Sequence, residues 1–389
     1  MTSAWKNLLA HIPVIEAGKI QGFAGMIILL LVFSIGSGDA LAADEKTDAQ
    51  KSLERRQKVE LLSFFLKDPS EAEVPTTPMS VELYNKAVGH MRKSEYDLAK
   101  DALLEAIALD EENALAYELL GDIEYLQQNM ASAKENYQVA YNLQPSKDLK
   151  EKISKLRKET KIERSLSTYR EKNFIIKYHD SEQNYEGFEL RELLRNVYRD
   201  ISEDFAYYFN HKVVVLLYDY ADYRKISEAP HWVAGFYDGK VRMPINARGY
   251  TDTQLRALTA HEVTHAFVAA MSEMKAPIWI HEGLAQYEEN KVKPLDMSVF
   301  ESAVSSGRLF PLMQIMSQGS VMQLRDPVSV TLFYRQVFHL ISFLEDRYGM
   351  FRIKKILEAF AAGKNSDEAI RSVLRISVDR LEREWKETL

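Results

Sequence analysis

Two short runs near the middle of the chain contain the residue types of a metal site. His261-Glu262-Val263-Thr264-His265 places two histidines four positions apart, with a glutamate directly after the first. Residues four apart share one face of a helix, so His261 and His265 can bind the same Zn²⁺. Glu262 lies one step round the helix and can act as general base toward a water at the metal. This spacing predicts a zinc site with hydrolytic chemistry.

The second run, Trp279–Tyr287, supplies a candidate third ligand. Glu282 lies in this run, and sixteen residues separate it from His265. Pro277 interrupts the chain between the two runs, so a second helix is expected to begin near His281. Two successive helices joined by a turn can bring Glu282 close to the two imidazoles. His281 is the alternative ligand. Neighbouring residues lie about 100° apart on a helix, so only one of the two is expected to bind the ion.

The residues around the first run favour a helix that can hold these ligands in place. Thr251-Asp252-Thr253-Gln254 has the pattern of a capping box. Neither proline nor glycine occurs from Thr251 to Met271, and apolar residues recur along this stretch. We therefore predict a helix that begins after Thr251 and carries both histidines.

The two runs together resemble the gluzincin metallopeptidases, and most closely their peptidase-MA-like branch. This resemblance covers residues 174–389 and implies a zinc peptidase domain over 170–389. It also implies that Glu282 is the third zinc ligand and that Glu262 is the catalytic base. Many gluzincins carry an acidic residue four positions after the ligand glutamate, where it orients a ligand histidine. This chain has Gln286 there, so the orienting group is Gln286 or lies elsewhere.

A hairpin is predicted before the zinc helix. Residues 232–245 read as two strands joined by a type I′ turn at Asp238-Gly239. Val241-Arg242-Met243 resembles the edge strand that holds an extended substrate in gluzincins; an ordinary edge hairpin is the alternative. His231 lies directly before the hairpin. Its side chain is expected either to donate a hydrogen bond to the oxyanion of the reaction or to face solvent in a loop.

A tyrosine in a later helix matches the same family. A helix is predicted from Val330 to Tyr348, and the resemblance places a tyrosine early in it, at Tyr334. A phenol directed at the zinc site could donate a hydrogen bond to the oxyanion of the reaction. The alternative is a tyrosine packed in the core.

Residues 80–163 contain an internal repeat. Ala99 and Ala133 are 34 residues apart, and so are Ala106 and Ala140. The pattern resembles tetratricopeptide repeats, which implies pairs of antiparallel helices, and residues 147–163 are expected to cap them. Such repeats recruit a protein partner or serve as a spacer. The expected fold class is α+β, with all-α tetratricopeptide helices followed by a gluzincin-type domain containing a small antiparallel or mixed sheet.

Composition limits the remaining possibilities. The chain has 389 residues, a formal net charge of −7 and no cysteine. General nucleic-acid binding is not indicated, and both cysteine-ligated zinc and thiol nucleophiles are excluded. Residues 23–35 are apolar and are followed by Ala40-Leu41-Ala42, which predicts a signal peptide over 1–42 or an uncleaved signal anchor. Residues 43–79 are expected to be a charged linker with a short helix.

These features lead to one functional hypothesis and one alternative. The hypothesis is zinc-dependent hydrolysis of peptide bonds in a protein or peptide outside the cytoplasm, in the periplasm or after secretion, with a partner recruited by the repeats. The alternative is a zinc-binding but weakly active or inactive scaffold of the cell envelope. Membrane attachment is expected only through an uncleaved N-terminal segment.

Overall fold

The computed structural model describes residues 78–179, 187–227, 235–244, 251–317, 324 and 326–389. The predicted signal segment, the linker helix and His231 lie outside these residues. Within the described residues, no helix combines the length and the apolar character needed to cross a membrane.

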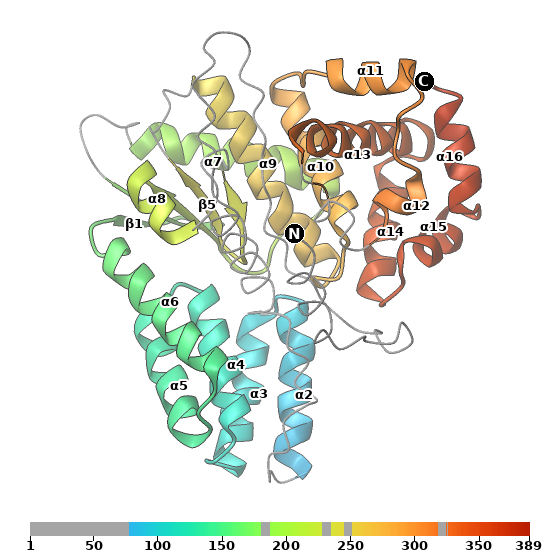
Figure 1. The fold of residues 1–389 in the computed structure, drawn as a ribbon. Helices are drawn as coiled ribbons and strands as arrows, with labels where there is room; N and C mark the ends of the chain where they lie inside the picture. Colours follow the sequence, from blue (N-terminus) through green and yellow to red (C-terminus); the bar gives the residue numbers. More distant parts are fainter. Residues whose placement is uncertain (1–77, 180–186, 228–234, 245–250, 318–323, 325) are drawn as a thin grey trace, which may run out of the picture.

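The N-terminal part consists of helices arranged in antiparallel pairs (Figure 1, blue to green). They are α2 (Pro78–Arg92), α3 (Tyr96–Leu109), α4 (Ala114–Leu126), α5 (Met130–Leu143) and α6 (Lys147–Glu163). Gly121 lies where α4 and α5 cross, because a Cβ there would be 2.5 Å from the Tyr137 ring. The close crossing explains why a small residue stands at this position. Helices are therefore present over the region in which repeats were predicted.

The sheet contains five strands in the order β1-β2-β3-β5-β4. They are β1 (Ser167–Arg170), β2 (Phe174–Tyr178), β3 (Val213–Tyr218), β4 (Phe236–Tyr237) and β5 (Val241–Pro244). The inner strands β2, β3 and β5 are parallel, and the outer strands β1 and β4 pair antiparallel with their neighbours. A mixed sheet next to many helices places the molecule in the α+β class.

Two details of the predicted hairpin are wrong. Val241-Arg242-Met243 is not an edge strand, because β5 lies between β3 and β4. The turn is not type I′, because Tyr237 pairs with Val241 and leaves three residues in the loop. Of these three, only Gly239 has a positive φ, at 87°. A type I′ turn needs two such residues, so the longer loop is favoured.

Both faces of the sheet are covered. Phe174, Val215 and Met243 point into the main core with α7 (Gly187–Phe205) and α9 (Asp252–Met271). Alternate residues, such as Ile175 and Leu216, point to the opposite face, which α8 (Tyr220–Ser227) helps to cover. Burial on both sides explains the nearly continuous apolar run of β3.

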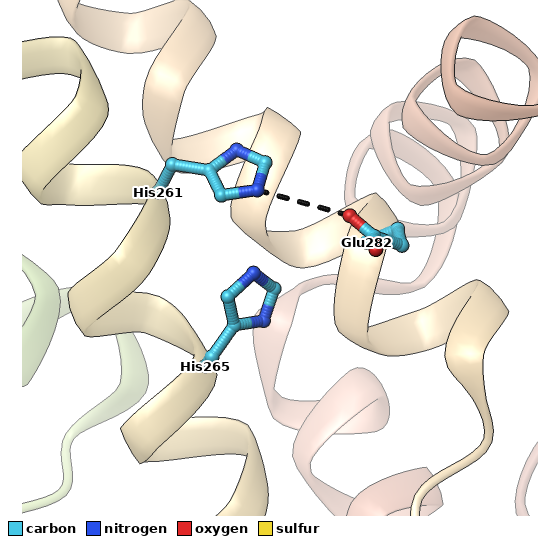
Figure 2. Close-up of side chains that lie close together, drawn as sticks. All are labelled: His261, His265 and Glu282. Carbon is cyan, nitrogen blue, oxygen red and sulfur yellow. Dashed lines mark ion pairs between the residues drawn. The ribbon is translucent and has the colours of Figure 1, made fainter. Parts of the chain in front are cut away.

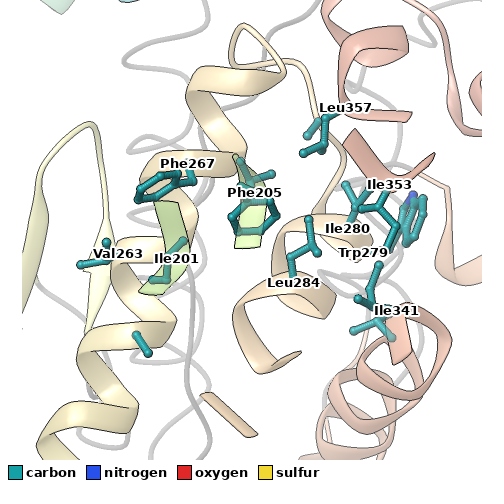
Figure 3. Close-up of a cluster of buried hydrophobic side chains, with 14 of the residues drawn as sticks. Ile201, Phe205, Val263, Phe267, Trp279, Ile280, Leu284, Ile341, Ile353 and Leu357 are labelled. Atoms are coloured by element: carbon teal, nitrogen blue, oxygen red, sulfur yellow. The ribbon is translucent and has the colours of Figure 1, made fainter. Parts of the chain in front are cut away.

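The remaining helices follow α9 along the chain. They are α10 (Ile278–Val292), α11 (Ser298–Ser305), α12 (Leu312–Ile315), α13 (Pro327–Tyr348), α14 (Met350–Ala361), α15 (Ser366–Leu374) and α16 (Val378–Lys386). In Figure 1, α9 and α10 lie between the sheet and the C-terminal helices. Figure 3 shows the core that joins these layers, with side chains from α7, α9, α10, α13 and α14 in one cluster. The zinc helix of the sequence analysis is therefore a central element of the fold.

Candidate metal centre

Three side chains from two helices converge in the centre of the molecule. His261 and His265 project from the same face of α9 toward Glu282 of α10 (Figure 2). Each residue offers one ligand atom, and these atoms all lie within 4.8 Å of one another. His261 Nε2 lies 3.7 Å from Glu282 Oε2. The structure thus brings together the three ligands that the sequence suggested.

Local features of both helices explain this arrangement. α9 begins with the predicted capping box, in which Thr251 and Gln254 each bond the other's backbone N–H. α10 begins at Ile278, directly after Pro277 and earlier than the sequence suggested. Gly283 follows the ligand and permits a close crossing, because a Cβ there would lie 2.9 Å from the backbone oxygen of Val337 on α13. The packing of α13 therefore fixes the position of the adjacent Glu282.

The polar atoms at this centre have unusual surroundings. His261, Glu262 and His265 are fully buried. Among the residues that the structure describes, no hydrogen-bond partner is found for His261 Nε2, for either ring nitrogen of His265 or for either carboxylate oxygen of Glu262. A buried polar group without a partner costs about 1–3 kcal/mol, and such groups are uncommon. These atoms are therefore suited to a ligand.

The donor set fits Zn²⁺. Two imidazole nitrogens and one carboxylate oxygen are a set of three protein ligands found in catalytic zinc sites. Such sites keep a further coordination position for water or substrate. Glu262 directly follows the first histidine, so a carboxyl group lies beside the proposed ligands. The residues present thus match both the metal and the adjacent base.

The carboxylate that orients His261 comes from an unexpected position. Glu289 Oε2 lies 2.8 Å from His261 Nδ1, so an Nδ1 proton is donated to Glu289 and Nε2 is left toward Glu282. Gln286, which the sequence suggested for this role, instead accepts a hydrogen bond of 2.6 Å from Arg335. Seven residues make about two helical turns, so Glu289 lies on the same face as Glu282. An acidic residue at this spacing was the signal that sequence reasoning missed.

Burial shifts the ionisable groups toward their neutral forms. It raises the pKa of Glu262 well above its ordinary value, and the nearby charge of Glu289 raises it further. Burial lowers the pKa of His265 well below its ordinary value, and His261 and His281 add to this shift. A neutral imidazole is the form that binds a metal, so burial keeps His265 ready for coordination.

Comparison with known families gives an independent result. The model of the Peptidase MA superfamily matches residues 208–389, which include β3 and all the residues of the candidate centre. This similarity supports a gluzincin-type, peptidase-like domain. The match does not extend over β1, β2 or the N-terminal helices. No curated protein and no solved structure matches the chain.

The alternative ligand in the peptidase-like domain is less suited to the metal. His281 is buried and, as for His265, burial lowers its pKa, in this case to about 3, so protonation does not distinguish the two histidines. Its ring centroid lies 5.7 Å from that of His265, but the metal-binding group assembled by the structure contains Glu282 and not His281. The geometry therefore favours Glu282 as the third ligand.

The candidate Tyr334, and two further residues of the C-terminal helices, lie in or near the core. Tyr334 is buried on α13, which packs against α10, and its ring lies 5.8 Å from that of Phe333. His339 accepts a hydrogen bond of 3.0 Å from Trp385 and stacks on Phe300. His339 and Trp385 thus pack against each other at the core. Tyr334 is still a candidate hydrogen-bond donor to the oxyanion, because its helix packs against the helix that carries Glu282.

A second group of metal-binding residue types has a different environment. His179, Asp219 and Asp222 also lie close enough to share an ion, but all three are at least partly exposed. Asp222 pairs with Lys225 at 2.7 Å. His179 Nε2 has no hydrogen-bond partner among the described residues, but it lies 3.9 Å from Asp219 Oδ2. None of the three residues is fully enclosed, which distinguishes this group from the buried centre.

Proposed function

We propose that the chain is a zinc-dependent peptidase in which His261, His265 and Glu282 hold the metal and Glu262 is the catalytic base. The main support is the buried meeting of these three ligands beside a carboxyl group, within a stretch similar to the Peptidase MA superfamily. When bound, Zn²⁺ supplies Lewis-acid polarisation of the scissile carbonyl and lowers the pKa of a coordinated water.

The protein's own residues divide the remaining work. Glu262, the residue directly after the ligand His261, takes a proton from the attacking water and passes it to the leaving amine. Glu289 holds the His261 ring in one orientation through Nδ1. Tyr334 is proposed as a hydrogen-bond donor to the developing oxyanion, since its helix packs against the helix that carries Glu282.

The proposed substrate is a protein or peptide outside the cytoplasm. This proposal is supported by the apolar N-terminal run and the Ala40-Leu41-Ala42 sequence, which favour export of the chain to the periplasm or its secretion. The helices α2–α6 are proposed as tetratricopeptide repeats that recruit a protein partner, on the basis of the 34-residue spacing.

One observation supports a second candidate, a zinc-binding scaffold of the cell envelope with weak or no activity. Glu262 is fully buried, so this conformation does not offer the base to solvent. A scaffold needs the metal for its fold and has no need of an accessible base. Hydrolysis requires an opening that admits substrate and water.

Metal content and hydrolysis measured together test the proposal. The full chain is expected to bind one zinc per molecule and to cleave an unstructured protein such as casein, and chelation should abolish cleavage. His265→Ala should lose the zinc, whereas His339→Ala should keep it. Unchanged zinc content in the His265 variant would contradict the site, and a zinc-loaded parent without hydrolysis would favour the scaffold.

A further inference from the structure

A group of buried charges joins the N-terminal helices to the sheet. Arg242 of β5 is fully buried and is surrounded by acceptors. Its guanidinium donates to Asp238 at 2.9 Å and to Tyr218 at 2.9 Å within the peptidase-like part. It also donates to Tyr125 of α4 at 2.7 Å and to Glu159 of α6 at 3.1 Å. One side chain of the sheet thus connects two N-terminal helices.

The loop between β4 and β5 makes further contacts with the same helices. Lys240 donates to Gln128 at 2.8 Å, and its Nζ lies 3.6 Å from the centroid of the Tyr125 ring. Lys155 of α6 pairs with Asp238 at 3.0 Å. The loop and β5 contain three charged residues, and all three contact the N-terminal helices. They are Asp238, Lys240 and Arg242.

The other end of the hairpin touches the candidate base. Gly235 directly precedes β4, and a Cβ on it would lie 2.5 Å from Glu262 Oε1 and 2.7 Å from Glu262 Cδ. Its φ lies outside the left-handed region, so the backbone conformation does not demand glycine. The Glu262 carboxyl group occupies the space that a side chain at this position would fill, so a Cβ there would displace that carboxyl group.

β4, the outer strand of the hairpin, has little support of its own, whereas β5 is an inner strand that also pairs with β3. β4 contains two residues and, among the described residues, pairs with β5 alone, and in β5 successive side chains point to opposite faces of the sheet. Val241 and Met243 belong to the core with α9, whereas Arg242 contacts α4 and α6. A short edge strand is easily displaced, so the buried contacts of the loop hold it in place.

We propose that the N-terminal helices position the base Glu262 by clamping the β4–β5 hairpin through Tyr125 and Glu159, so that both are positioning residues for peptide hydrolysis. This inference rests on the proposed peptidase function. It gives the N-terminal helices a part in the reaction itself, separate from any recruitment of a partner.

The N-terminal helices also supply a matched control. Asp122 of α4 is a buried carboxylate that accepts from Tyr137 at 2.7 Å and pairs with Lys152 at 2.7 Å. Glu159 likewise accepts from a tyrosine, Tyr125, and pairs with a cation. The two carboxylates have similar surroundings, but the contacts of Asp122 are all with the N-terminal helices. Comparison of the two separates clamping of the hairpin from general weakening of these helices.

The test uses the full zinc-loaded chain with Glu159→Gln and Asp122→Asn. Glu159→Gln is expected to lower kcat for casein-type peptides about tenfold, with KM and zinc content unchanged, because a small displacement of a catalytic group slows the reaction strongly. It should also speed hydrogen exchange at the backbone amides of residues 235–244. Asp122→Asn should change neither quantity. Tyr125→Phe, which removes one hydroxyl, replaces Glu159→Gln if that variant does not fold.

A double-mutant cycle tests the path through Gly235. Gly235→Ala alone should lower kcat, and its effect should combine less than additively with Glu159→Gln, because both displace the same carboxyl group. Equal slowing by Glu159→Gln and Asp122→Asn, fully additive effects, or unchanged exchange in the hairpin would each overturn the inference. If the zinc-loaded parent does not hydrolyse peptides, the proposed function fails. Clamping is then decided by hydrogen exchange alone, which must rise in Glu159→Gln and not in Asp122→Asn.

Discussion

Two buried clusters of charged residues lie on opposite sides of the β4–β5 hairpin, and they differ in how their atoms are satisfied. At the contact with the N-terminal helices, Arg242 and Glu159 are almost completely buried and are paired with each other. At the candidate metal centre, His265 and Glu262 are equally buried, yet none of their side-chain nitrogens or oxygens has a partner among the described residues. Burial alone therefore does not indicate a ligand site, whereas several buried atoms without hydrogen-bond partners in one place do.

The largest effect, on the rate of hydrolysis, is expected at the candidate metal centre. Glu262→Gln keeps the shape of the side chain and removes its basicity, so hydrolysis should fall by about 10²–10⁴-fold while the zinc content is retained. Zinc stoichiometry and the rate of casein cleavage measure the two quantities. Glu288→Gln on α10 is the control and should retain most of the activity. A Glu262→Gln variant that cleaves like the parent would remove the main difference between the clusters.

Loss of a cation from the paired cluster should mainly affect folding. Arg242→Met leaves Asp238 and Glu159 buried without their main partner, which should lower the free energy of unfolding by about 3–5 kcal/mol. Arg347→Met removes an exposed pair with Glu384 and should cost less than about 1 kcal/mol. Urea unfolding followed by circular dichroism measures both changes. Similar values for the two variants would show that burial adds nothing to this pair.

A smaller effect is expected where a single carboxylate supports the metal centre. Glu289→Gln should weaken zinc binding by about 10–100-fold, because it removes the charged acceptor at His261 Nδ1. Glu288→Gln changes the neighbouring acid, which pairs with Lys291, and should leave zinc affinity unchanged. Competition with a chromogenic chelator gives the two affinities. Equal affinities in both variants would contradict the orienting role of Glu289.

The smallest effect is expected in how the free energy of unfolding depends on pH, through the carboxylates that pair with Arg242. Burial acts to raise the pKa values of Asp238 and Glu159, but the charges of Arg242, Lys155 and Lys240 together outweigh it, and both pKa values are lower than usual. Their ionised forms therefore stabilise the fold fully above about pH 4.5, and this contribution is lost as pH falls through the lowered values. Asp238→Asn should reduce the loss of stability between pH 5 and 3 in urea titrations. An unchanged pH profile in this variant would refute the assignment.

Local features of the fold could be predicted from the sequence. The capping box at Thr251 placed the start of α9 correctly, and the apolar runs Phe174–Tyr178 and Val213–Tyr218 form β2 and β3. Capping and burial patterns act within a few residues, so they can be recognised without a structure. Helix periodicity and the break at Pro277 allowed His261, His265 and Glu282 to meet, and the family resemblance selected Glu282 as the third ligand.

The features that the sequence did not reveal depend on distant contacts. The inner position of β5 is set by pairing with both β3 and β4, and its own residues do not specify this. Glu289 was missed because the family resemblance pointed to Gln286. In the structure, Arg335 of α13 donates a hydrogen bond to Gln286. Arg335 is 49 residues away in the chain, so only the packing of α13 on α10 shows which acid is left for His261.

The burial of α9 on nearly all sides has a consequence for how the protein matures. Its residues from Ala257 to Ala269 are buried, so they are enclosed only when the sheet, α10 and the C-terminal helices have all closed around them. The three ligand residues therefore meet only where these elements have packed together, and the unfolded chain presents no ready site. If zinc binds there as proposed, its binding is coupled to the completion of this domain.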